Sequence, residues 1–153
     1  MELETRKKAF TKLGETLRTY VAGPEEESPE SEYHQLLRGA VEKAGITNPW
    51  FTPFSVNEAL RSIGSNLKQE HLEKWTGQYS ELGRQTGPPQ TIGVVNAGNI
   101  PFVGFHDFLS VLLSGNIYYG KLSLKDEHLP IAIASLLTDI ESGFSEMIKF
   151  ERK

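Results

Sequence analysis

The feature that most constrains the fold is an alternation of strand-like and helix-like apolar patterns that begins at Thr91. Ile92, Val94 and Val95 form a short β-branched run without helical period, as expected of a buried strand in a parallel sheet. A helical stripe over 105–113, a strand-like run at 117–119, a helical stripe over 129–140 and a third strand starting at 147–150 follow. Strands that alternate with helices predict right-handed crossovers and an α/β domain with a parallel sheet over residues 91–153.

Residues 1–90 have a different character, because nearly all of their apolar residues recur at helical spacing. The first predicted helix is amphipathic, with its stripe at Phe10, Leu13, Leu17 and Val21. After a solvated linker over 23–32, the second helix is predicted over about 30–44, capped by Ser28 with Pro29 in its first turn and ended by Gly45. The third is predicted over about 56–66 with a capping box formed by Ser55 and Glu58, and the fourth carries Leu67, Leu72, Trp75 and Tyr79.

Composition narrows the classes of function. The 153 residues carry a formal net charge of −4, so long-range attraction to nucleic acid phosphates or to anionic lipid is not expected, and an acidic ligand must be caught locally. The absence of cysteine excludes disulfides and thiolate metal sites, and it fits a reducing, cytoplasmic setting. No apolar window of about 20 residues predicts a membrane span, and the N-terminal MELETRKKAF predicts no signal peptide.

The carboxyl ends of the first two predicted strands, 96–100 and 121–125, lie where a parallel α/β sheet binds its ligand. Gly98 allows a tight turn or a close backbone approach, and Pro101 suits a helix start. The amide of Asn99 is a candidate donor to an oxyanion, while the alternative is that Asn96 and Asn99 only cap the helix or satisfy the turn. Lys121 is a candidate for holding a ribose or phosphate oxygen, or it is simply solvated.

Other site signatures are absent from the sequence. Neither the G-x-G-x-x-G fingerprint nor the P-loop pattern occurs. His106 and Asp107 are adjacent and point in different directions on a helix, which disfavours a shared metal or acid–base role. His34, His71 and His128 have no partners at zinc-site spacing, so no metal site is predicted.

The order of several short motifs resembles a known family. These are Asn48-Pro49-Trp50-Phe51-Thr52-Pro53, Leu72-Glu73-Lys74-Trp75, Ala97-Gly98-Asn99-Ile100-Pro101, Val103-Gly104-Phe105-His106-Asp107-Phe108, Leu112-Leu113-Ser114-Gly115-Asn116 and Lys121-Leu122-Ser123. Together they resemble the N-terminal part of the acyl-CoA reductases related to the LuxC fatty acid reductases, within the aldehyde dehydrogenase superfamily. The resemblance covers nearly the whole chain and is most specific over 97–123.

The resemblance implies roles for particular residues. Asn99 matches the asparagine whose amide stabilises the thiohemiacetal oxyanion, and Lys121 matches the lysine that binds the adenine-side ribose or 2′-phosphate. Ala97, Gly98 and Ser123 complete the implied NAD or NADP contacts. Ala97-Gly98 stands where aldehyde dehydrogenases have Pro-Trp, and Leu122 and Leu124 replace a proline and a glutamate. These departures leave the choice between NAD and NADP open.

The implied reaction is reduction of a fatty acyl thioester, on CoA or a carrier protein, to an aldehyde through a cysteine acyl-enzyme. The chain has no cysteine, so it is expected to be an N-terminal fragment of a Rossmann-like reductase that does not catalyse alone. Two alternatives remain. One is a non-catalytic domain that binds a nucleotide or a protein, and the other is an assembly subunit that pairs with a separate catalytic chain. A homo-oligomer is compatible with each.

Overall fold

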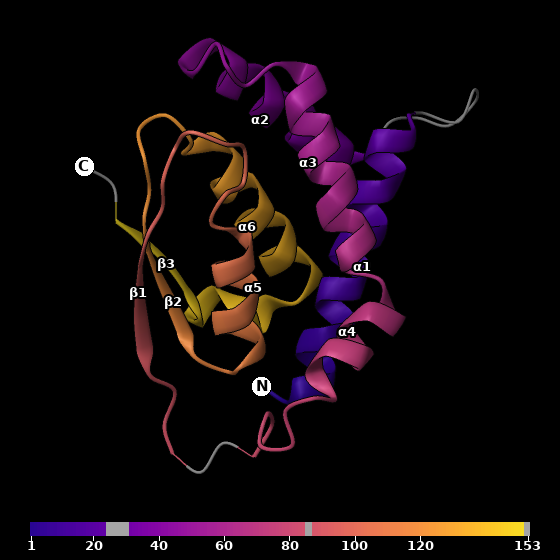
Figure 1. The fold of residues 1–153 in the computed structure, drawn as a ribbon, viewed down its shortest axis with the longest axis vertical. Coiled ribbons are helices and arrows are strands. Elements are labelled where there is room, and N and C mark those ends of the chain that lie inside the picture. Colours follow the sequence, from indigo (N-terminus) through magenta and orange to yellow (C-terminus); the bar gives the residue numbers. More distant parts are fainter. Residues whose placement is uncertain (24–30, 85–86, 152–153) are drawn as a thin grey trace.

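The computed structural model describes residues 1–23, 31–84 and 87–151. Its N-terminal part is helical, as predicted, and Figure 1 shows these helices packed side by side. They are α1 (Leu3–Ala22), α2 (Glu32–Thr47), α3 (Pro53–Asn66) and α4 (Gln69–Thr76). Within the described residues, no helix is both long and apolar enough to cross a bilayer.

The second part has the predicted β-α-β-α-β order. Its strands are β1 (Thr91–Val95), β2 (Ile117–Lys121) and β3 (Ile148–Glu151), joined through the helices α5 (Phe105–Leu113) and α6 (His128–Ile140) and the 3₁₀ helix η1 (Ser142–Glu146). The sheet order is β1-β2-β3 and both pairs are parallel. The prediction of a parallel sheet is therefore confirmed.

Among the described elements, helices cover only one face of the sheet. Figure 1 shows α5 and α6 between the sheet and the N-terminal helices, with no described element on the other side of the strands. Because both crossovers step in the same direction along the sheet, both helices lie on the same face. Side chains in β1 consequently alternate between exposed and half-buried, and Val95 is 82% exposed. The prediction of a buried strand is therefore wrong for β1.

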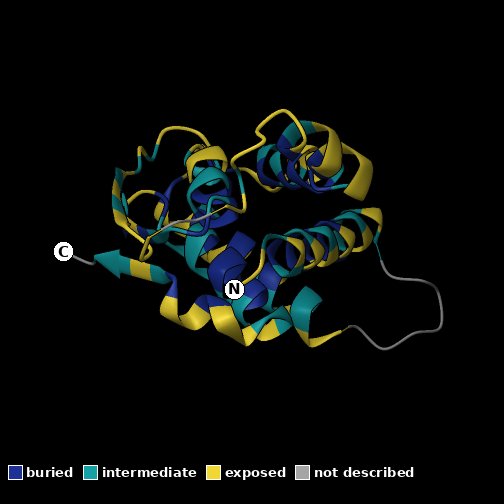
Figure 2. Ribbon diagram, turned by 90° about the horizontal axis from the view of Figure 1, so that it is seen from below, coloured by how far each residue is buried: buried dark blue, intermediate teal, exposed yellow. Residues whose placement is uncertain are grey.

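One cluster of buried apolar residues joins the two parts of the chain. Phe10 of α1 is fully buried and meets the rings of Phe108 and Phe144 edge to face, with centroids 6.4 and 5.6 Å apart. Arg6 is also buried, and its Nε donates to the carbonyl of Leu113 at 3.2 Å, which attaches α1 to the end of α5. Figure 2 shows the buried residues where the helices meet and the exposed ones on their outer faces. The domain boundary at residue 90 stays a prediction.

Several predicted helix ends are corrected. Thr52, not Ser55, caps α3, because its side chain accepts from the backbone N–H of Ser55 and Pro53 takes the first helical position. Glu58 instead contacts Arg61 one turn along the helix. Ser31 caps α2 by accepting from the N–H of His34, and α2 runs past Gly45 to Thr47. The predicted cap at 28–29 lies outside the described residues.

Candidate functional site

The carboxyl ends of the three strands meet at one edge of the sheet. Val95 pairs with Lys121, and Lys121 pairs with Glu151, so the loops that follow β1 and β2 begin side by side. These loops, 96–104 and 122–127, contain all of the predicted site residues except Lys121, which ends β2. The parallel topology therefore brings the predicted residues to the edge where α/β sheets bind ligands.

Gly98 lies against Ser123, so two of the predicted cofactor residues are in contact. A Cβ at residue 98 would overlap Ser123 Oγ and would stand 2.8 Å from Ser123 Cβ and 2.9 Å from Lys125 Cβ. Only glycine fits this approach, and it is made to protein atoms rather than left open for a ligand. Ser123 Oγ also accepts from the backbone N–H of Lys125 at 3.2 Å, which shapes the loop after β2.

Asn48 fastens both loops to the end of α2. Its buried side-chain nitrogen donates to the carbonyl of Gly98 at 3.2 Å and to the carbonyl of Lys125 at 3.5 Å. Its Oδ1 accepts from the backbone N–H of Trp50 at 3.2 Å. Asn48 belongs to a motif that carries the family resemblance, but sequence reasoning assigned it no role.

Ala97, Asn99 and Lys121 are the exposed members of the predicted set, and Asn99 and Lys121 are the two with polar side chains. In the described part of the chain no hydrogen bond engages the Asn99 amide, and no ion pair engages the Lys121 ammonium. Asn99 therefore does not serve as a helix cap in this structure. Both side chains present their donors to solvent at the edge of the sheet, where a ligand could take them up.

Asn96 satisfies the turn after β1, which is the structural role given as the alternative in the sequence analysis. Its Nδ2 donates to the hydroxyl oxygen of Tyr118 at 2.8 Å, and the hydroxyl donates to Asn96 Oδ1 at 3.1 Å. The backbone N–H of Asn96 donates to the carbonyl of Lys121 at 3.0 Å. A Cβ at Gly104 would overlap Asn96 Oδ1, so a larger residue there would displace the Asn96 amide. Asn96 thus locks the turn after β1 onto β2.

Tyr118 was missed by sequence reasoning, although it is one of the largest fully buried side chains. Its ring meets Phe108 edge to face with centroids 5.0 Å apart, and a Cβ at Gly120 would clash with that ring. Burial raises the pKa of the Tyr118 hydroxyl above its ordinary value, with the hydrogen bond to Asn96 opposing. The phenol is therefore a neutral hydrogen-bonding group at the edge of the sheet. The sequence signal that could have identified Tyr118 is a tyrosine that stands two residues before a glycine in the same strand.

Asp126 was also missed, and it joins the two loops from the other side. Its buried carboxylate accepts the backbone N–H of Phe102 at 3.1 Å through Oδ2, while Oδ1 is buried without a hydrogen-bond partner among the described residues. Burial raises the pKa of Asp126 to about 6, and the Phe102 hydrogen bond lowers it in part. Phe102 has a φ of 59°, a left-handed conformation that is strained for a bulky residue.

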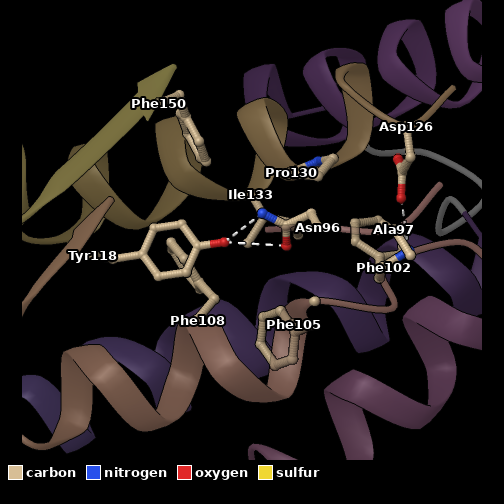
Figure 3. Close-up of a pocket in the computed structure, with 11 residues that line it drawn as sticks. Asn96, Ala97, Phe102, Phe105, Phe108, Tyr118, Asp126, Pro130, Ile133 and Phe150 are labelled. Atoms are coloured by element: carbon tan, nitrogen blue, oxygen red, sulfur yellow. Dashed lines mark hydrogen bonds between the residues drawn. The ribbon is translucent and has the colours of Figure 1, made fainter. Parts of the chain in front are cut away.

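This turn explains a further correction. The helix predicted to start near Pro101 begins at Phe105, since residues 101–104 form turns that present the Phe102 N–H to Asp126. Figure 3 shows the Tyr118 hydroxyl pointing toward the Asn96 amide, and the Asp126 carboxylate pointing toward the Phe102 backbone. Asn99 lies between these two fastened positions in the sequence. Its backbone is therefore held at both ends of a short loop.

A cavity of about 20 Å³ lies behind the loop. That volume suits about one water molecule, so a nucleotide or an acyl chain would not fit in it. Its lining is mostly apolar and comes from both loops, both crossover helices and β3, with Asn96, Tyr118 and Asp126 as its polar side chains (Figure 3). At this end of the sheet, a larger ligand would lie outside the cavity, on the open edge formed by the two loops.

The histidines do not form a site. The His106 ring lies 5.5 Å from the Trp75 ring. His34, His71 and His128 each have a ring nitrogen 2.9–3.1 Å from an oxygen atom of a serine or threonine. Among the described residues, no three His, Cys, Asp or Glu side chains gather as they would around a metal ion.

Comparisons of the chain with protein-family models, with curated proteins and with solved structures find no match.

Proposed function

We propose that this chain is the N-terminal part of an NAD(P)H-dependent acyl-CoA reductase, which reduces a fatty acyl thioester to an aldehyde. The observation that carries the proposal is the contact between Gly98 and Ser123 at the carboxyl edge of a parallel sheet. It unites the two segments that the family resemblance assigns to cofactor binding. Lys121 ends the strand that leads into the second segment, and Asn99 follows the first.

The side chains present suit the cofactor chemically. The Lys121 ammonium and the Ser123 hydroxyl are donors of the kind that ribose and phosphate oxygens accept, and the Lys121 side chain reaches solvent. The small cavity is excluded as the nucleotide site, so the cofactor would lie along the exposed edge. When bound, NAD(P)H supplies the hydride that converts the acyl group to an aldehyde.

In the proposed reaction a thiolate attacks the acyl carbonyl and forms a tetrahedral oxyanion, which collapses with loss of the CoA or carrier thiolate. Asn99 would donate its amide N–H to that oxyanion, as its exposed position allows. The chain contains no cysteine, so the thiolate would come from a polypeptide segment outside these 153 residues. The chain's own contribution is thus oxyanion stabilisation and cofactor binding.

The first test is NADPH binding, measured by the change in NADPH fluorescence on titration with the protein. Lys121→Gln should weaken binding about tenfold, the effect of losing one charge-assisted hydrogen bond. Lys149→Gln is the matched control, because Lys149 is an exposed lysine of the neighbouring strand and should bind as the unmodified chain does. Equal weakening in both variants, or no binding at all, would contradict the assigned cofactor site.

The second test concerns Asn99 in a preparation that also contains a cysteine-bearing reductase segment. Asn99→Ala should lower the rate of aldehyde formation about a hundredfold or more without altering NADPH affinity. Asn66→Ala, an exposed amide at the end of α3, should leave the rate unchanged.

The absence of cysteine favours a second candidate, a non-catalytic nucleotide-binding or assembly domain derived from the same family. NADPH binding that persists while no added polypeptide restores aldehyde formation would support this candidate over the reductase.

A further inference from the structure

Large apolar side chains are exposed at the carboxyl end of the sheet, on the loops after β1 and β2 and around the α2–α3 connection. Trp50 is 85% exposed and Phe54 76%, both near the α2–α3 connection. Leu124, in the loop after β2, is 68% exposed, and Ile100, in the loop after β1, is 56% exposed. We refer to these four residues as the apolar rim. Large apolar side chains that are exposed together are typical of interaction surfaces.

One side chain holds the three segments that carry the rim together. Asn48 donates to the carbonyls of Gly98 and Lys125, and it accepts the backbone N–H of Trp50. Figure 1 shows the α2–α3 connection at the same end of the molecule as the loops that follow β1 and β2. Side chains on these loops can therefore meet a common partner without rearrangement of the backbone.

Charge distinguishes this surface from the rest of the chain. Segments 46–54, 95–103 and 121–125 contain two lysines, Lys121 and Lys125, and no carboxylate, whereas the whole chain has a net charge of −4. Both lysines are exposed. The adjacent Asp126 is buried, and the carboxylate of Glu127 lies 4.0 Å from the His128 ring. Lys121 has the acidic Glu151 as its register partner on β3, whereas Lys125 lies in the loop after β2 and has no register partner.

The shape of the rim separates two kinds of apolar ligand. A single acyl chain is bound in a concave pocket, but the rim residues project outward, and the cavity behind them measures about 20 Å³. Protruding Trp, Phe, Leu and Ile side chains on loops, accompanied by lysines, are suited to the interface of a bilayer that contains anionic lipid. Tryptophan in particular favours that interface, since its ring is apolar and its N–H is polar.

We propose that the apolar rim docks this chain peripherally onto an anionic lipid bilayer, with Trp50 and Phe54 inserted at the headgroup level and Lys125 contacting anionic headgroups. The proposal rests on the exposure and charge of the rim rather than on the reductase assignment, although both involve the loops that follow β1 and β2. It concerns a surface association, which requires no membrane-spanning helix.

The test uses the full chain with phosphatidylcholine vesicles, with and without phosphatidylglycerol. The sequence has two tryptophans, Trp50 on the rim and Trp75, which is half-buried beside His106. In Trp75→Phe the emission of Trp50 should shift to shorter wavelength on addition of phosphatidylglycerol vesicles and not with phosphatidylcholine alone. In Trp50→Phe the emission of Trp75 should not shift. A Trp50 signal that is unchanged by anionic vesicles would overturn the proposal.

Cosedimentation with the same vesicles provides matched controls. Trp50→Ser and Phe54→Ser should each reduce the bound fraction several-fold, whereas Tyr79→Ser should not. Tyr79 is an exposed aromatic residue in the segment that follows α4, and Figure 1 shows α4 away from the end that carries the loops after β1 and β2. Lys125→Gln should weaken binding about fivefold and Lys74→Gln should not. Equal loss in a rim variant and its control would refute a specific rim contact. Concentration-dependent self-association that is abolished by Trp50→Ser, without vesicle binding, would show instead that the rim joins copies of the chain.

Discussion

Asp126 accepts the backbone N–H of Phe102 at 3.1 Å, and Phe102 has a left-handed conformation in the turn between β1 and α5. The carboxylate is buried, and its second oxygen has no hydrogen-bond partner among the described residues. The turn that follows Asn99 is therefore held by the Asp126 carboxylate, whose negative charge is destabilised by burial.

This cost predicts a pH dependence of stability. The pKa of Asp126 is raised from 3.8 to about 6. Between about pH 4 and pH 6 the Asp126 carboxyl group is therefore protonated in the folded chain and ionised in the unfolded chain. The free energy of unfolding should therefore be highest below pH 4 with respect to this group, fall as pH rises to about 6, and stay lower above it, by at most about 3 kcal/mol. Urea denaturation across this range should show the fall in the native chain and not in Asp126→Asn. The exposed Asp139→Asn is the control, and a fall that persists in Asp126→Asn would assign it elsewhere.

Replacement of Asn48 should loosen the site edge. Asn48→Ala removes the donor shared by the carbonyls of Gly98 and Lys125 and should lower the free energy of unfolding by about 1–3 kcal/mol. Asn66→Ala, at an exposed position, should change it by less than about 0.5 kcal/mol. Similar losses of unfolding free energy in the two variants, measured by chemical denaturation, would mean that the Asn48 hydrogen bonds do not stabilise the fold.

A methyl group at position 98 should be destabilising. Gly98→Ala drives a Cβ into Ser123 and should lower the free energy of unfolding by about 1–3 kcal/mol, while added Ser123→Gly should restore part of the loss. Gly39→Ala is the opposite control. That glycine lies within α2 with nothing within 4 Å of the added Cβ, and alanine there should stabilise the chain by about 0.5–1 kcal/mol. A neutral Gly98→Ala would show that the contact with Ser123 is not tight.

The Tyr118 hydroxyl should contribute to stability through Asn96. Tyr118→Phe deletes the hydroxyl and leaves the Asn96 amide without this partner, so a loss of about 1 kcal/mol is expected. Tyr119→Phe serves as the matched control, because Tyr119 is the next residue of β2 and points to the exposed face. Thermal unfolding of the pair should separate them. No difference would mean that water replaces the Asn96 contact at no cost.

Much of the architecture follows from local pattern. The stripe at Phe10, Leu13 and Leu17 predicts the buried face of α1, and all three residues are fully buried. The alternation after Thr91 predicts the order of strands and helices. The apolar spacing of a strand and that of a helix can be told apart over a few residues, because their periods are about two and 3.6. Helix ends were less predictable. Thr52 and Ser55 are both acceptable caps, and the choice depends on where the chain leaves the preceding turn.

The sequence by itself determined the parallel βαβ order and the position of Asn99, Lys121 and Ser123 at one edge of the sheet, since carboxyl ends of parallel strands always meet there. Only the tertiary structure decided which polar groups fasten that edge. Asn48, Tyr118 and Asp126 come from distant segments, and their roles depend on distances and burial that no local pattern encodes. The same holds for the bare face of the sheet. Whether helices cover one face or both depends on the direction in which each crossover steps, and this is settled only when the strands are placed side by side.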